Sequence, residues 1–369
     1  MRICFFDPIE WDYTVETPHQ RALGGSQSAL CYLAEALAKA GHGVALANKT
    51  RDPGVKRGVN CVGPDPGQTV DFLTSFDAIV VLNAALGANL RRVLGPKARL
   101  VLWTQHAFDQ KPMSYLKEEA ERNAWDRFVL ISDWQAKTYV ETFGIPEEKI
   151  VIRRNAVAPV FETLSPGKAW FQHKGAEPVL AYTSTPFRGL DVLLTAFPAI
   201  RAARPGARLR IYSSMQVYNE GEGPYPVLYE LAKALTGVEY IGSRPQPELA
   251  KAMAATGLLA YPNTFAETSC IAVMEAMIAG ALVITTDLGA LPETTGGFGF
   301  LIPPISDRVV HAAVFAQRCV QLIQQAEADP QAFADHRARQ MAHARANLVW
   351  SRRAREWSET LAALVAERP

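Results

Sequence analysis

The chain has 369 residues, of which 49% are hydrophobic and 20% charged, a composition that allows a packed core and excludes a disordered chain. This length exceeds one ordinary hydrophobic core and predicts two domains. The 38 Lys and Arg residues balance 37 Asp and Glu residues, evenly in the two halves, so a nucleic-acid partner with its need for a basic face is not expected.

The N-terminus leads from Met1 straight into the apolar run 2–6, without the basic and apolar regions of a signal peptide. Runs of about 18 apolar residues are absent from the sequence. We therefore expect a cytoplasmic protein, or at most one peripheral at the inner face of a membrane. The five cysteines are widely spaced and lack a CxxC pair, which predicts reduced thiols.

Short apolar runs alternate with helical patterns from the first residue on, which is typical of βαβ units and a doubly wound α/β class. In the first half the pattern predicts strands at 2–6, 43–48, 77–82, 99–104, 127–131 and 150–153, and helices at 26–40, 87–94, 114–124 and 133–143. In the second half it predicts strands at 179–183, 208–212, 238–241, 257–260, 282–285 and 299–302, and helices at 189–203, 226–236, 246–255 and 269–279.

A stretch rich in Pro and Gly at 155–177 separates these two series and has the composition of a linker. The expected domains are 1–160 and 161–345. The remaining segment, 346–369, is helical in pattern, and its apolar residues recur with helical spacing. This last helix therefore needs an apolar surface, which the first domain can offer.

The most informative segment follows the apolar strand 258–262 and carries Glu267 and Glu275, with seven residues between them. Thr268 or Ser269 is a good N-cap, so we expect a helix from Ser269 whose free N–H groups attract phosphate. Eight helical residues rise about 12 Å, so the two glutamates could hold opposite ends of an elongated ligand. The alternative is that Glu267 caps a loop and Glu275 forms a surface ion pair.

Glu275 lies among apolar neighbours, and a buried carboxylate without a partner is costly. It therefore needs a ligand or a hydrogen-bond donor. Vicinal hydroxyl groups on ribose and on a hexose would supply donors to both carboxylates.

The two glutamates and the run 276–287 after them resemble the donor-site signature of retaining glycosyltransferases of group 1, or family 4, with the GT-B fold. The resemblance implies two Rossmann-like domains facing across a cleft, with the C-terminal helix crossing back to the N-terminal domain. It also implies that Glu275 binds the ribose and that Glu267 acts catalytically at the transferred sugar. Here Ser269 and Cys270, at the expected phosphate-binding turn, replace the family's usual Phe-Gly.

Three further segments match this family along the chain. Gly24 and Gly25, between the first strand and its helix, occupy the place of a phosphate-binding glycine loop; an ordinary loop capped by Ser26 is the alternative. His106 follows the strand at 99–104, where the family places a histidine near the sugar; a structural histidine is the alternative. Arg188 matches a cation for the diphosphate, or else is a solvated residue in a helical turn.

The resemblance implies transfer of a hexosyl group from a UDP- or GDP-sugar to an acceptor hydroxyl with retention of configuration. We expect no cofactor and no metal, because no metal-ligand cluster is visible in the sequence. The acceptor is an unidentified glycan, lipid-linked sugar or small molecule, recognised by the N-terminal domain. Two alternatives remain at this point: a nucleotide-sugar epimerase on the same scaffold, and a non-catalytic nucleotide-binding partner subunit.

Overall fold

The computed structural model describes residues 1–67 and 69–367. These residues form two compact units, and the first unit is built from two pieces of the chain. It contains residues 1–156 together with the chain from Val349 onward, while the second unit is the continuous segment Val157–Leu348. The boundaries expected from the sequence are 160/161 and 345/346.

The first unit is built on an eight-stranded sheet with the order β3-β4-β2-β1-β5-β6-β7-β8. All neighbours pair in parallel except β3 and β4. Its strands are β1 (Arg2–Phe6), β2 (Gly43–Ala47), β3 (Gly54–Lys56), β4 (Val59–Val62), β5 (Ala78–Leu82), β6 (Leu100–Trp103), β7 (Arg127–Leu130) and β8 (Ile150–Ile152). Its longer helices are α2 (Gly25–Lys39), α5 (Gly87–Leu94), α6 (Glu119–Ala124), α7 (Asp133–Phe143) and α16 (Trp350–Ala366).

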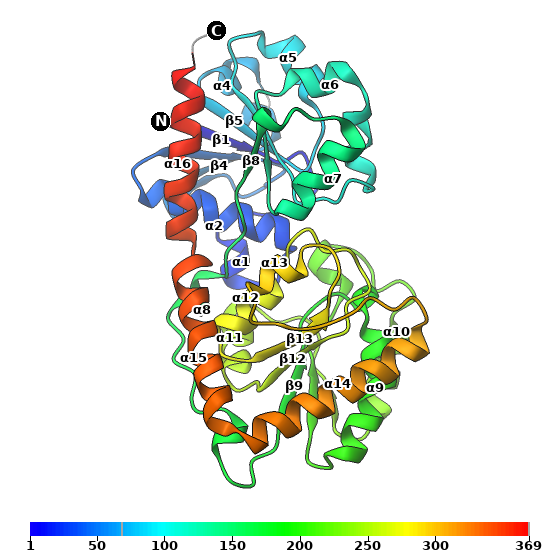
Figure 1. The fold of residues 1–369 in the computed structure, drawn as a ribbon. Helices are drawn as coiled ribbons and strands as arrows, with labels where there is room; N and C mark the ends of the chain where they lie inside the picture. The colour runs from blue at the N-terminus through cyan, green and yellow to red at the C-terminus, as the bar shows by residue number, and fades with distance from the viewer. Residues whose placement is uncertain (68, 368–369) are drawn as a thin grey trace. The chain divides into compact units, whose positions relative to one another are not determined.

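The C-terminal helix α16 packs on α2 within the first unit, as Figure 1 shows. The predicted stripe of α2, formed by Leu30, Leu33 and Leu37, is fully buried. On α16 the Trp357 ring makes edge contacts with Phe5 and Trp103 of the central strands, at centroid distances of 6.4 and 5.1 Å. The expectation that this last helix returns to the first domain is confirmed.

The second unit is built on a six-stranded, all-parallel sheet with the order β11-β10-β9-β12-β13-β14 (Figure 1). Its strands are β9 (Val179–Tyr182), β10 (Arg208–Ile211), β11 (Val238–Tyr240), β12 (Leu258–Tyr261), β13 (Leu282–Thr286) and β14 (Phe300–Ile302). Its main helices are α9 (Leu190–Ala203), α10 (Pro226–Ala234), α11 (Gln246–Ala254), α12 (Ile271–Ile278), α14 (Arg308–Ala328) and α15 (Pro330–Asn347).

Two features differ from the sequence-based expectation. The antiparallel strands β3 and β4 were not predicted, because they have only three and four residues, too few for a readable period. They meet at a turn where Arg57 and Gly58 have φ angles of 49° and 84°. The second difference is α12, which begins at Ile271 and not at Ser269, so the expected N-cap is wrong.

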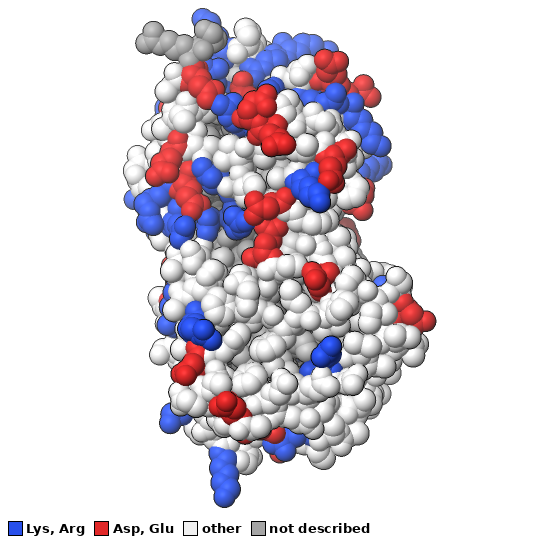
Figure 2. Space-filling model, viewed as in Figure 1, with Lys and Arg blue, Asp and Glu red and all other residues white. Residues whose placement is uncertain are grey.

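Charges of both signs are interspersed over the first unit on the face drawn in Figure 2, in keeping with the balanced composition. All five cysteines are buried and unpaired. Within residues 1–67 and 69–367, no helix combines the length and apolar character that crossing a bilayer requires.

Candidate donor-binding site

The candidate site lies at the carboxyl edge of the second unit's sheet. From β9 the chain first adds β10 and β11 on one side and then returns to place β12 on the other. The order of strands therefore reverses between β9 and β12, and ligands of open α/β sheets bind at such a reversal. Arg188 follows β9 and Glu267 follows β12, so the topology brings these two residues together.

Arg188 ends a short turn, Pro186–Arg188, and Gly189 after it has a φ of 103°, a conformation that favours glycine. A Cβ atom at Gly189 would lie 2.1 Å from the Pro262 carbonyl oxygen. Glycine is thus required here on two counts, and it lets the loop after β9 lie directly against the loop after β12.

The Arg188 guanidinium forms an ion pair with Glu267, with 2.5 Å between Nη1 and Oε1. The two side chains are only 19% and 4% exposed. The guanidinium also lies over the Phe265 ring, 4.6 Å from its centroid, and donates to the Tyr218 hydroxyl at 3.2 Å. Burial alone would lower the pKa of Arg188, but the Glu267 charge outweighs it and holds that pKa well above its usual value.

Glu267 is held by its backbone as well as by its side chain. Its Oε1 accepts a hydrogen bond of 2.5 Å from the Tyr261 hydroxyl. Its carbonyl oxygen accepts from the Ala290 N–H at 2.7 Å. Gly289, with a φ of 63°, passes so close that a Cβ atom there would lie 2.4 Å from the same carbonyl. The predicted alternative, a simple loop cap, does not describe this residue.

Glu275 lies on α12 and is only 4% exposed, so the alternative of a surface ion pair is wrong. One long hydrogen bond of 3.4 Å reaches its Oε1 from the Ala158 N–H, and the Gln246 side chain lies beside it. Burial raises the pKa of Glu275 to about 8, and these two partners only partly offset the effect. The carboxyl group is therefore largely protonated at neutral pH and has capacity for further hydrogen bonds.

Ser269 and Cys270 are both buried, immediately before α12. Cys270 is the N-cap but makes no side-chain capping bond, and burial raises the pKa of its thiol, which stays protonated. The Ser269 hydroxyl has no hydrogen-bond partner among the described residues. Because 267–270 is loop, the predicted helical rise from Glu267 to Glu275 is wrong, and only the part from Ile271 is helical.

In the first unit, Gly24 is the N-cap of α2 and Gly25 its first residue, so the expected glycine loop is partly helix. Gly24 has an ordinary φ of −54°, and its backbone does not use the freedom that glycine offers. Nearby, the buried Asp7 at the end of β1 accepts hydrogen bonds from the Tyr13 hydroxyl at 2.6 Å and from Gln27 at 3.1 Å. Gln27 thereby fastens the first turn of α2 to the sheet edge.

His106 follows β6 and is half-buried. Its carbonyl oxygen accepts from Gln135 and from the Tyr139 hydroxyl, both at 2.8 Å, which fixes the backbone. The ring Nδ1 is buried without a partner among the described residues. Burial lowers the pKa of His106 to about 4, so the imidazole is neutral at neutral pH.

The structure thus joins Arg188 to Glu267 and places Ser269, Cys270 and Glu275 on the adjoining loop and helix. Sequence reasoning missed Tyr218, Tyr261 and Phe265, which complete the surroundings of the ion pair. Tyr261 could have been found as the last strand residue before an acidic loop. Tyr218 carries no such signal, because 212–225 has no regular period. The described residues hold no group of three or more His, Cys, Asp or Glu side chains suited to a metal.

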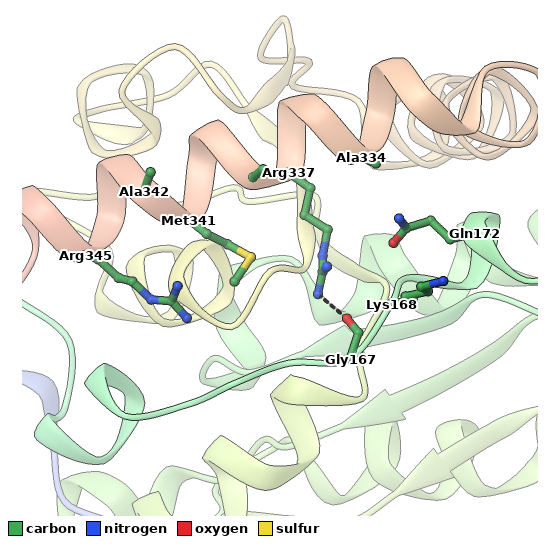
Figure 3. A pocket seen from close by; sticks show the side chains of 9 residues that line it. Gly167, Lys168, Gln172, Ala334, Arg337, Met341, Ala342 and Arg345 are labelled. Carbon is green, nitrogen blue, oxygen red and sulfur yellow. Dashed lines mark hydrogen bonds between the residues drawn. The ribbon is translucent and has the colours of Figure 1, made fainter.

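A shallow, open groove of about 420 Å³ lies elsewhere in the second unit, between α15 and residues 167–172 (Figure 3). Arg337 on its wall donates to the carbonyl oxygens of Gly167 and Gly280 at 2.9 and 2.6 Å. Gly280 directly precedes β13, so the groove adjoins the amino edge of the sheet, opposite the loops that carry Arg188 and Glu267. Arg337 thus joins backbone segments and is no part of the candidate donor site.

Comparison with known proteins agrees with this geometry. Residues 177–325 match the family model described as glycosyl transferases group 1, so the second unit carries a domain of this group. The matched range includes Arg188, Glu267 and Glu275. No curated protein sequence matches the chain.

Solved structures match over nearly the whole length. HepE of Anabaena, in complex with UDP-glucose, has a TM-score of 0.73 at 18% identity, covering 98% of this chain and 100% of that one. Sucrose-phosphate synthase from Thermosynechococcus elongatus has a TM-score of 0.71 at 17% identity, covering 99% of each chain. Trehalose 6-phosphate synthase from Burkholderia multivorans has 0.68 at 12% identity, covering 99% and 97%. These likenesses establish the expected GT-B fold.

Proposed function

We propose that this chain, a GT-B protein with a group 1 glycosyltransferase domain at residues 177–325, transfers a hexosyl group from a UDP- or GDP-sugar to an acceptor hydroxyl with retention. The observation that carries this proposal is Glu275, a buried carboxyl group with one long backbone hydrogen bond and the Gln246 side chain beside it. It follows Glu267, which forms a buried ion pair with Arg188, by eight residues. A ligand that has both hydroxyl groups and negative charge can donate hydrogen bonds to the two glutamates and form an ion pair with Arg188.

In this proposal the ribose hydroxyls donate to Glu275, and the diphosphate lies at the N–H groups that begin α12 and near Arg188. Glu267 meets the hydroxyls of the transferred sugar. The C1–O bond to the diphosphate breaks as the acceptor oxygen bonds to C1 from the same face. The departing phosphate oxygen takes the acceptor proton, so neither a base nor a metal is needed. Stabilisation of the leaving diphosphate is the largest contribution.

His106 is proposed to act on the transferred sugar through its position and polarity. An imidazole with a pKa of about 4 is a weak base, so proton abstraction is not its role. His106→Ala should leave the affinity for bare nucleotide unchanged and lower transfer at least about tenfold. Wild-type turnover in this variant would make His106 a structural residue.

The experiment that tests the proposal is a thermal-shift screen against UDP-, GDP- and ADP-sugars, followed by an assay with the donor that binds. A bound donor raises the unfolding midpoint by mass action. Nuclear magnetic resonance of the product then gives the anomeric configuration. Inversion would refute retention, conversion of the donor without an acceptor would indicate an epimerase, and binding without turnover a non-catalytic subunit.

A further inference from the structure

Tyr261 is a buried tyrosine with no part in the function proposed above. It ends β12, is 1% exposed, and its hydroxyl donates to Glu267 Oε1. The Ser184 hydroxyl lies 3.4 Å from the same oxygen of Tyr261. Because the single hydroxyl proton of Tyr261 goes to Glu267, Ser184 is the donor in that contact. Hydrogen bonds thus run from Ser184 through Tyr261 to Glu267, and such chains strengthen their members.

The two contacts of the Glu267 side chain converge on one oxygen. Arg188 Nη1 and the Tyr261 hydroxyl both lie 2.5 Å from Oε1. The other oxygen of Glu267, Oε2, accepts no hydrogen bond from residues 1–67 and 69–367. Burial and the Glu267 charge raise the pKa of Tyr261 well above its usual value, so this hydroxyl keeps its proton and stays a donor. Oε2 is therefore the oxygen of Glu267 that is left to accept from a sugar hydroxyl.

Arg188, in contrast, has two competing partners in the proposed function. Its guanidinium forms the ion pair with Glu267, and its Nε is buried without a hydrogen-bond partner among the residues that the structure describes. A diphosphate carries more negative charge than one carboxylate and attracts the same guanidinium more strongly. If Arg188 turns to the diphosphate, Glu267 loses its cation and retains only the Tyr261 hydroxyl.

We propose that Tyr261 is a positioning residue that keeps Glu267 aimed at the sugar after the donor's diphosphate has drawn Arg188 away. The Arg188–Glu267 ion pair is then the unloaded state of the site, and binding of the donor opens it. This inference rests on the proposed function of the same site. It makes two predictions that can be measured separately, one for Tyr261 and one for the ion pair.

The first experiment compares Tyr261→Phe with Tyr182→Phe. Tyr182 is equally buried, its ring contacts Tyr261 at 5.8 Å, and its hydroxyl donates to the Thr185 carbonyl instead of a carboxylate. Tyr261→Phe should lower kcat at least about tenfold, as loss of a hydrogen bond to a charged group implies. Its KM for the donor and its affinity for bare nucleotide should stay within about threefold. Tyr182→Phe should keep kcat within about twofold.

Equal kcat values for the two variants, or a common fall in kcat, nucleotide affinity and unfolding temperature, would overturn the positioning role. Thermal unfolding of both variants identifies a merely structural effect. If the wild-type protein itself transfers no sugar but binds nucleotide, the proposed function fails, and the second experiment still tests the ion pair.

The second experiment measures binding of bare UDP or GDP to Glu267→Gln by calorimetry. Glutamine keeps the shape and the acceptor for Tyr261 but removes the charge that competes for Arg188. Binding of the nucleotide should tighten at least about threefold, because the diphosphate then meets a buried cation without a counter-ion. In the same variant transfer should fall. Unchanged or weaker nucleotide binding would overturn the exchange of Arg188.

Discussion

Two buried glutamates, one in each unit, have opposite surroundings. Glu121 on α6 is 6% exposed and accepts three short hydrogen bonds. They come from the Gly87 and Ala88 N–H groups at 2.7 and 2.8 Å and from the Trp125 indole at 2.9 Å. Glu275 on α12 is equally buried but has only one backbone donor, at 3.4 Å, and the Gln246 side chain as partners. Burial is thus the same, while the number of donors differs.

The difference separates a carboxylate that holds the fold together from one available to a ligand. Glu121 caps the first N–H groups of α5, where a negative charge is stabilised by the helix dipole. Glu275 lies about one turn from the N-terminus of an apolar helix, and in exchange for water it has gained only the Ala158 N–H and the Gln246 side chain as partners. Burial alone would have given both residues the same role. The following predictions test this contrast, in order of decreasing effect.

The largest effect is expected for Glu121→Ala. It leaves two helix N–H groups and an indole N–H buried without acceptors, at about 1–3 kcal/mol for each unsatisfied group. The first unit should lose about 3 kcal/mol or more of unfolding free energy, which lowers its midpoint by roughly 6 °C or more. Calorimetry gives the midpoint, with the exposed Glu119→Ala on the same helix as control. An unchanged midpoint in Glu121→Ala would show that Glu121 does not stabilise the first unit, and the contrast with Glu275 would fail.

Glu275→Ala should act on binding and leave the fold largely intact, since one long hydrogen bond is lost. Because the carboxyl group is largely neutral, loss of its hydrogen bond to ribose costs about 0.5–1.5 kcal/mol, or about 2- to 12-fold in the Kd for UDP or GDP. Calorimetry with the bare nucleotide measures this, with the exposed Glu248→Ala on α11 as control. Normal nucleotide affinity in Glu275→Ala would show that this carboxyl group does not bind the ribose.

An effect of similar size, per pH unit, is expected from pH. The folded-state pKa of Glu275, about 8, lies above its unfolded value, so the folded protein holds a proton that the unfolded chain releases. Without nucleotide, stability should therefore fall as pH rises from about 5 to 8, by up to about 1.4 kcal/mol per pH unit from this group. Urea titrations of the wild type and Glu275→Gln isolate this contribution. Identical pH dependence in both would contradict it.

The last prediction is that EDTA has no effect on nucleotide binding or sugar transfer. If Glu275 and Glu267 bind a nucleotide-sugar and not a metal cation, excess chelator should change neither the nucleotide affinity nor the transfer rate. An initial-rate assay with and without EDTA suffices. Activity that is lost and then restored by Mg²⁺ or Mn²⁺ would assign these carboxylates, or others, to a metal.

The fold was largely predictable because its strands and longer helices carry clear periods. The helices at 87–94 and 133–143 were predicted to the residue, and the apolar stripe of α2 was read correctly. The short β3 and β4 were missed, since their pairing depends on a tight turn at Arg57. In the site, the apolar neighbours of Glu275 indicated it as a candidate, whereas Arg188 was indicated by the family resemblance. Their different environments, one nearly unpartnered and one paired, depend on tertiary contacts that no local pattern contains.

The first unit is closed by a helix that follows the whole second unit in the chain. Trp357 contacts Phe5 and Trp103, so the core begun by the first strand is completed only after the whole second unit has left the ribosome. The second unit is continuous in sequence and can fold without waiting for any later segment of the chain. During translation the N-terminal sheet therefore exposes an apolar face until α16 has been made. Chaperones can bind this face in that interval. A fragment released before α16 is made would expose it permanently and would be prone to aggregate.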